Sequence, residues 1–260
     1  MSRIAEKFQA LNKHKALIPY ITAGDPDLAT TEALILKMAE CGADIIELGV
    51  PFSDPMADGP VIQRATERAL TKGTKLIDIL DLVSRVRKVS QVPIVLFSYF
   101  NPLLQFGLEK LAKKAAEVGI DGVLVTDLSP EEAGEFLNIL YRYKLDMIFL
   151  LAPTSSDERI AKVTRLARGF IYAVSRTGIT GMQQTLSDTV VELVSRIRKH
   201  SNLPIAVGFG ISSREQVKDV CRYADGAVVG SRIVAEIEEC KDQTQLLEKI
   251  GNLIQELASD

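Results

Sequence analysis

The sequence is poor in residues that bind metals or form disulfides: its 260 residues include two histidines, three cysteines and no tryptophan. The cysteines lie far apart and form no CxxC pair or Cys/His cluster, which argues against a disulfide framework or a zinc site. Two histidines, His14 and His200, are too few for most metal sites. We therefore expect no bound metal and a reducing compartment, the cytoplasm.

Long apolar runs and an excess of one charge are missing too. No apolar run approaches the roughly 20 residues of a membrane helix, and the charged stretch Met1–Lys15 lacks the apolar core of a signal peptide. The net charge is −3 with both signs interspersed, whereas nucleic-acid-binding domains are usually basic. We expect a protein that binds neither membranes nor nucleic acids.

Short apolar runs rich in β-branched residues recur eight times, and most are separated by stretches of helical periodicity. Eight strand–helix units in about 250 residues predict a (β/α)8 TIM barrel, an α/β fold, with residues 1–260 as one domain. A doubly wound sheet usually has a GxGxxG turn after its first strand, a spacing that Thr22–Pro26 lacks. The expected strands are Leu17–Thr22, Asp44–Val50, Pro93–Tyr99, Gly122–Asp127, Asp146–Ala152, Phe170–Ser175, Pro204–Gly208 and Ala227–Gly230.

Helical periodicity and capping signals place the helices. Ser129 would cap a helix with Pro130 at its first position, and Ser212–Glu215 resembles a capping box. The main expected helices are Leu28–Cys41, Leu108–Val118, Pro130–Tyr143, Asp157–Ala167, Asp188–His200 and Ser212–Tyr223. Extra helices are expected before the first strand and after the second and eighth strands, at Ile4–Leu11, Val61–Leu70 and Ile233–Glu238.

Two carboxylates near the end of the second expected strand are the first candidates for chemistry. Glu47 interrupts an apolar strand, where burial of an unpaired carboxylate is costly, and such breaks in a pattern tend to mark functional sites. In a TIM barrel, a strand's C-terminal end faces the active site. Two structural alternatives stay open: Glu47 could form an ion pair at the barrel rim, and Asp58, which precedes glycine, could be an ordinary turn residue.

Glycine-rich segments follow the last three expected strands, at Ser175–Gly181, Gly208–Ser212 and Gly230–Ser231. The loops after strands seven and eight, with a short extra helix, form the usual phosphate site of this fold. Glycines let backbone N–H groups approach phosphate oxygens, and a helix N-terminus favours negative charge. These segments predict a phosphate site, although a tight turn would explain any one of them alone. The stretch Arg176–Ser187 has the length of a functional lid.

Large apolar residues near the expected strand ends could wall a ring-shaped pocket beside this site, or could simply fill the core. They include Tyr20, Phe97, Tyr99, Leu124, Tyr172 and Phe209. No lysine lies inside an expected strand, which disfavours a Schiff-base aldolase. What is left is carbon chemistry by two carboxylates on a phosphorylated, partly apolar substrate.

Three segments resemble the tryptophan synthase alpha subunit family, in order and with matching spacing along essentially the whole chain. They are Pro19–Pro26, Glu47–Pro60 and Ser175–Gly181. The resemblance implies a (β/α)8 barrel that cleaves indole-3-glycerol phosphate to indole and glyceraldehyde 3-phosphate in tryptophan biosynthesis.

The family's functional residues map onto this sequence. The resemblance implies that Glu47 is the acid–base group and Asp58 the second catalytic carboxylate. It implies phosphate binding by Gly181, Gly210, Gly230 and Ser231, and an indole pocket made by Tyr20, Phe97, Leu124, Tyr172 and Phe209. It also implies no cofactor in this chain and a beta subunit partner that carries pyridoxal phosphate, in an alpha2beta2 complex. The loop Phe52–Asp58 and the Asn101–Pro102 turn would face that partner.

Three other functions remain open at this point. The chain could be another phosphosugar barrel, such as an epimerase or isomerase, which would share the phosphate loops but not the carboxylate pair. It could be a non-catalytic barrel that only activates or seals a beta subunit. It could also be a stand-alone lyase that releases free indole.

Overall fold

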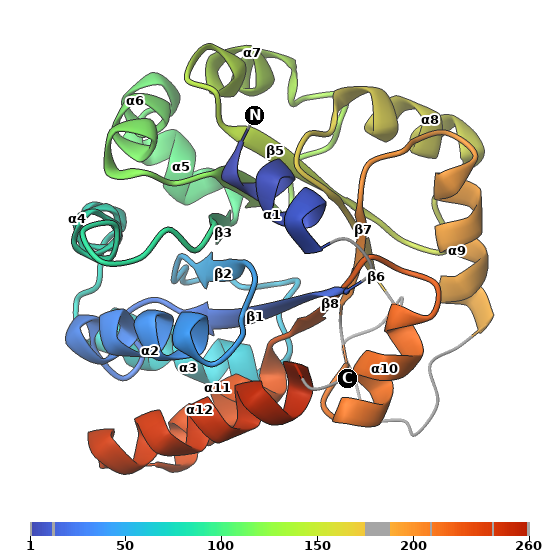
Figure 1. Cartoon of the computed structure of the whole chain (residues 1–260). Coiled ribbons are helices and arrows are strands. Elements are labelled where there is room, and N and C mark those ends of the chain that lie inside the picture. Colours follow the sequence, from blue (N-terminus) through green and yellow to red (C-terminus); the bar gives the residue numbers. More distant parts are fainter. Residues whose placement is uncertain (1, 12–13, 175–187, 209, 241, 259–260) are drawn as a thin grey trace.

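Eight parallel strands close into a barrel in which each strand pairs with the next and β8 returns to β1 (Figure 1). The computed structural model describes residues 2–11, 14–174, 188–208, 210–240 and 242–258. The strands are β1 (Ala16–Thr22), β2 (Ile46–Gly49), β3 (Ile94–Ser98), β4 (Gly122–Val125), β5 (Asp146–Leu151), β6 (Ile171–Val174), β7 (Ile205–Gly208) and β8 (Gly226–Val229). The predicted TIM barrel is confirmed, and the open-sheet alternative is wrong.

Helices surround the barrel (Figure 1). The extra helices predicted before the first strand and after the second and eighth are confirmed as α1 (Arg3–Leu11), α3 (Pro60–Thr71) and α11 (Ser231–Glu239). The others are α2 (Leu28–Glu40), α4 (Leu76–Val86), α5 (Phe100–Phe106), α6 (Leu108–Val118), α7 (Gly134–Arg142), α8 (Asp157–Leu166), α9 (Asp188–Arg198), α10 (Arg214–Cys221) and α12 (Gln243–Ala258). No helix in these described ranges has both the length and the apolar character needed to cross a bilayer.

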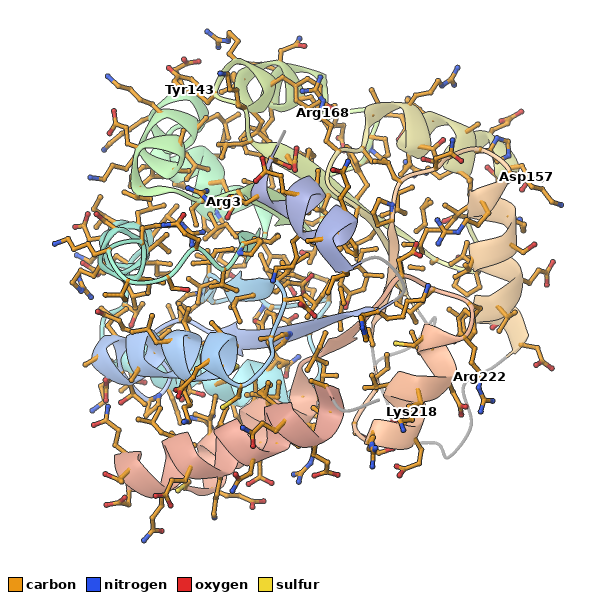
Figure 2. The ribbon with its side chains drawn as sticks, in the orientation of Figure 1. Arg3, Tyr143, Asp157, Arg168, Lys218 and Arg222 are labelled. Carbon is orange, nitrogen blue, oxygen red and sulfur yellow. The ribbon has the colours of Figure 1, made fainter. Side chains whose placement is uncertain are left out.

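Two apolar layers follow from the two faces of each strand. On β1, Ile18 and Tyr20 belong to the cluster inside the barrel, while Leu17 and Ile21 pack into the layer between strands and helices. Charged side chains such as Asp157, Lys218 and Arg222 are exposed on the outer helices (Figure 2). The barrel interior is therefore a packed core, separate from the layer between strands and helices.

Helix α1 closes the N-terminal end of the barrel, which we call the base; we call the opposite, C-terminal end the mouth. Ile4 of α1 is fully buried, and Ile4, Phe8 and Leu11 pack against the interior cluster. The rings of Phe8 and Phe170 lie 5.9 Å apart. Figure 1 shows α1 lying across the strands.

The predicted starts of two helices had different outcomes. Ser213 caps α10 through its side chain, and Gln216 completes a capping box, one residue beyond the predicted motif. The start at Ser129–Pro130 is wrong, because α7 begins at Gly134. The Ser129 carbonyl accepts the N–H groups of Glu132 and Ala133 in turns, while its hydroxyl bonds the Glu132 carboxylate instead of capping.

Candidate active site

Glu47 is a buried carboxylate inside the mouth. On β2 it lies in register between Tyr20 of β1 and Val95 of β3, two residues of the interior cluster. It is 1% exposed, and neither carboxylate oxygen has a hydrogen-bond partner among the described residues. Burial raises the pKa of Glu47 to about 8. The rim ion-pair alternative is therefore wrong within the described part of the chain, and Glu47 is protonated at neutral pH.

Asp58 lies in the loop that joins β2 to α3. Its N–H donates to the Pro55 carbonyl at 3.1 Å, so its backbone does form the turn that the Asp-Gly pair suggested. Asp58 is half-buried, and this burial raises the pKa of its carboxyl group to about 6, while a hydrogen bond from the Tyr99 hydroxyl lowers this pKa. Burial is the main cause that raises the pKa of Tyr20, and Asp58 and Glu47 raise it further because their ionised forms would place negative charge near that phenol. The two carboxylates therefore meet in one mouth, one protonated and one ionised between about pH 6 and 8.

Four of the five predicted indole-pocket residues come together inside the barrel: Tyr20, Phe97, Leu124 and Tyr172. The rings of Tyr20 and Phe97 meet edge to face, with centroids 5.2 Å apart. Burial raises the pKa of Tyr172, and the charge of ionised Glu47 raises it further, a sign that this hydroxyl also lies near the carboxylate. The fifth residue, Phe209, lies outside the described residues. The group forms an apolar, aromatic wall around Glu47.

Two glycines let the tyrosine rings reach this position. A Cβ atom on Gly49 would overlap the Tyr20 hydroxyl, and one on Gly208 would overlap the Tyr172 hydroxyl. Both glycines lie on strands and face the barrel interior, two residues beyond Glu47 and Ala206. Their role is to leave room for phenol groups, a function that strand patterning alone does not reveal.

The predicted phosphate residues fall at the mouth where they are described. Gly230 is the N-cap of α11 and Ser231 is its first residue. A Cβ on Gly230 would lie 3.4 Å from the Tyr20 Cβ, so this helix start borders the aromatic wall. Gly210 has φ 83°, the left-handed region that favours glycine. Gly181 and the lid stretch Arg176–Ser187 lie outside the described residues.

The comparisons with known proteins agree with this geometry. The family model described as tryptophan synthase alpha chain matches residues 7–259. The tryptophan synthase alpha chain of Geobacter sulfurreducens is 58% identical over 240 residues, which cover 92% of this chain and 91% of that protein. This chain belongs to the tryptophan synthase alpha chain family.

Solved structures show the same relationship. The tryptophan synthase subunit alpha of Legionella pneumophila has a TM-score of 0.91 at 37% identity, with 99% of this chain and 97% of that chain covered. A chain from Mycobacterium tuberculosis tryptophan synthase also has a TM-score of 0.91, at 39% identity and the same coverage. The tryptophan synthase alpha chain fold therefore extends over nearly the whole chain.

Tyr99 has a role in this tryptophan synthase alpha chain that the sequence did not reveal. Its hydroxyl accepts the Ala57 N–H at 2.9 Å and donates to the Asp58 carboxylate, and its ring packs on Phe52 with centroids 5.4 Å apart. Tyr99 thus holds the Asp58 loop from the end of β3. The sequence did contain one sign of this role: Tyr99 lies two residues beyond Phe97, which places both side chains on the same face of the extended chain.

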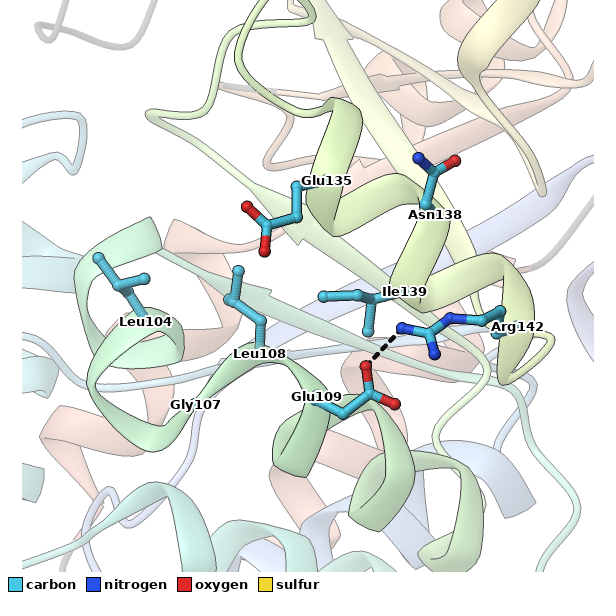
Figure 3. Close-up of a pocket in the computed structure, with 8 residues that line it drawn as sticks. All are labelled: Leu104, Gly107, Leu108, Glu109, Glu135, Asn138, Ile139 and Arg142. Carbon is cyan, nitrogen blue, oxygen red and sulfur yellow. Dashed lines mark hydrogen bonds and ion pairs between the residues drawn. The ribbon is translucent and has the colours of Figure 1, made fainter.

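A second hollow lies outside the barrel, between α5–α6 and α7, and its volume is about 480 Å³ (Figure 3). Leu104, Leu108 and Ile139 supply its apolar surface. Of its two acidic residues, Glu135 is exposed and Glu109 is paired with Arg142, as the dashed line in Figure 3 shows. Among its lining residues, this groove brings together no buried, unpaired titratable groups.

Proposed function

We propose that Glu47 and Asp58 carry out the reaction of this family. Tryptophan synthase alpha chains are lyases of tryptophan biosynthesis, and this chain, as a member, cleaves indole-3-glycerol phosphate to indole and glyceraldehyde 3-phosphate. One observation carries the assignment of residues: a protonated Glu47, with no hydrogen-bond partner among the described residues, faces an aromatic wall beside a carboxylate of lower pKa. Pairs of carboxylates whose environments separate their pKa values are typical acid–base sites.

In the proposed mechanism Glu47 first donates its proton to C3 of the indole ring. The ring becomes a cation with its positive charge near the nitrogen. Ionised Glu47 then removes the proton of the hydroxyl on the adjacent side-chain carbon. The O–H electrons form the aldehyde C=O, the bond between C3 and that carbon breaks, and its electron pair restores the aromatic ring. Glu47 ends the cycle protonated. A positioned acid–base group typically contributes about 10²- to 10⁴-fold in rate.

We assign to Asp58 the stabilisation of the positive charge that develops on the indole ring. Its carboxylate accepts a hydrogen bond from the indole N–H and stabilises the cation, in a site where burial strengthens electrostatic interactions. Gly210, Gly230, Ser231 and the undescribed Gly181 bind the phosphate through backbone N–H and hydroxyl groups. Tyr20, Phe97, Leu124, Tyr172 and the undescribed Phe209 hold the indole ring.

Alpha chains of this family work with a beta subunit. We propose an alpha2beta2 complex in which the partner holds pyridoxal phosphate, this chain needs no cofactor, and residues 1–260 form one domain in the cytoplasm. The loop Phe52–Asp58 and the Asn101–Pro102 turn would face the partner. Exposed apolar residues support this face: Met56 in the loop is 84% exposed, and Leu104 on α5 is 50% exposed. Exposed apolar groups of this kind often mark protein interfaces.

Indole release from indole-3-glycerol phosphate tests the proposal, with the purified chain measured alone and with a beta subunit. We expect a slow rate alone that increases strongly with the partner. A high rate alone would favour a stand-alone lyase. Release in neither mixture would contradict the proposal and leave another phosphosugar reaction or a non-catalytic barrel.

A further inference from the structure

Two arginines on α3 join three segments that border the mouth. Arg68 donates to both oxygens of Asp25, from Nε and Nη2, at 2.8 Å each, and its Nη1 donates to Glu238 at 2.8 Å. Arg64, one turn earlier, donates to both Glu238 oxygens at 2.7 Å each. Two positive and two negative groups therefore form one network, in which both arginines bind a carboxylate with two parallel hydrogen bonds.

Each segment in the network carries or adjoins a residue of the proposed site. α3 begins at Pro60, two residues after Asp58. Glu238 lies on α11, whose N-terminus holds Gly230 and Ser231. Asp25 follows β1, the strand of Tyr20. The network thus connects the helix behind the second carboxylate with the helix behind the phosphate site, and both helices pack side by side (Figure 1).

The network is more firmly built than an ordinary surface ion pair. The Asp25 side chain is 1% exposed, and the loop that carries it is pinned because Gly24 packs directly on Thr74, beyond the end of α3. Most exposed ion pairs contribute little, but two-bond geometry and networks are the exceptions. Hydrogen bonds and charge from Arg64 and Arg68 lower the pKa of Glu238 to about 2, so Glu238 stays charged across the working pH range.

We propose that Arg64 and Arg68, through Glu238 and Asp25, are positioning residues that set the placement of the phosphate-binding helix relative to the Asp58 loop. The proposal rests on the function proposed above. The substrate has to reach both half-sites at once, with its phosphate at α11 and its indole ring at Asp58. A shift of about 1 Å between the half-sites can cost on the order of 100-fold in rate. Ligands that occupy only one half-site would not respond to such a shift.

Glu238→Gln tests this inference in the full-length chain, because it removes one charge and leaves the Arg68–Asp25 pair intact. The matched control is Glu32→Gln. Glu32 pairs with Arg85 at 2.7 Å and joins α2 to α4, and its side-chain exposure of 28% is close to the 27% of Glu238. Both variants lose the same chemical group from a similar surface, and only one loses a connection between the half-sites.

We expect Glu238→Gln to lower kcat/KM for indole-3-glycerol phosphate about 10- to 100-fold, and Glu32→Gln to lower it less than about twofold. The Kd of glycerol 3-phosphate, which occupies the phosphate half-site alone, should be unchanged in both. The shape of the pH profile should also be unchanged, because Glu238 does not titrate in that range. Arg64→Lys, which keeps the charge and loses the two-bond geometry, should give an intermediate effect even if Glu238→Gln folds poorly.

Two results would overturn the inference. Equal activity of Glu238→Gln and Glu32→Gln would show that the network does not act on the reaction. A parallel loss of glycerol 3-phosphate affinity would show that it only orders the phosphate helix. If the unmodified chain with its partner released no indole, the proposed function would be contradicted, and the positioning role that rests on it would be contradicted too.

Discussion

The carboxylates at the base of this barrel are hydrogen-bonded in a way that Glu47 at the mouth is not. At the base, Asp44, Asp121 and Asp225 each accept an N–H from the start of a neighbouring strand, at 2.8–2.9 Å. Asp121 also pairs with Arg3 and Arg87. At the mouth, Glu47 is as deeply buried as Asp121, yet no described group bonds its oxygens. One end uses charge to hold strands in register, and the other keeps a carboxyl group free to exchange a proton.

Among the variants considered, Glu47→Gln should have the largest effect, because it removes the proton-exchanging group at the mouth. We expect kcat/KM to fall at least about 10²- to 10⁴-fold, because an amide cannot donate and recover the proton. Binding of a non-cleavable indole–phosphate analogue should stay measurable, since Gln fills the same space. Near-normal turnover in this variant would end the acid–base assignment.

Asp121→Asn should instead lower the stability of the fold, because it disrupts the ion pairs at the base. The change leaves Arg87, whose side chain is 9% exposed, without its carboxylate, and loss of one partner of a buried pair typically costs about 3–5 kcal/mol. Urea titration would measure this loss, and activity per folded molecule should stay near normal. Asp81→Asn, which removes an exposed pair with Lys114, is the control and should change stability by no more than about 0.5 kcal/mol. A stable Asp121→Asn protein would contradict the structural role of the base.

The pH dependence of stability sharpens the contrast. Glu47 ionises near its ordinary pKa of 4.5 in the unfolded chain but only near 8 in the folded one. Its contribution to folding is therefore complete below pH 4.5 and decreases as the pH rises to about 8. At pH 7 Glu47→Gln should be more stable than the unmodified chain by roughly 3 kcal/mol, from about 1.4 kcal/mol per pH unit. Urea titrations at pH 4 and pH 7 would check this, and an equal difference at both would refute it.

The smallest effect concerns Tyr99. Tyr99→Phe keeps the ring on Phe52 but removes the hydrogen bond that stabilises ionised Asp58, so the pKa of Asp58 should increase. The acidic limb of the kcat/KM profile should move up by about one pH unit or less, with a loss of a few-fold at pH 7. Tyr141→Phe, which loses a hydroxyl contact to Leu166 on the helix ring, is the matched control. Superimposable profiles for the two variants would show that Tyr99 does not act on Asp58.

Periodicity was enough to predict the barrel, because eight apolar runs and the helices between them are local patterns. Helix α5 was not predicted, and its start shows why. Asp127, from beyond β4, accepts the Phe100 N–H at 2.7 Å, so the cap comes from a distant part of the chain. Pro102 sits in the first turn, where proline is tolerated but looks like an interruption. Local signals also misplaced α7, whose start is set by turns at Ser129.

The site was predictable in its positions but not in its chemistry. A lone carboxylate in an apolar strand marked Glu47, and the family resemblance suggested the residues around it. That Glu47 has no described partner depends on which side chains line the barrel, and that Asp58 meets Tyr99 depends on the path of a loop. Both properties arise from packing between segments that are far apart in the sequence, as does the network of Arg64 and Arg68.

Helix α1, which closes the base, also affects the path by which a small product can leave the barrel. With Ile4 and Phe8 packed into the interior core, α1 blocks the described part of the base. With the base blocked in this way, indole formed beside Glu47 would leave through the mouth, the end by which the substrate enters. In the complex that we propose, a partner that captures indole would cover the mouth, where Met56, in the loop between β2 and α3, is exposed.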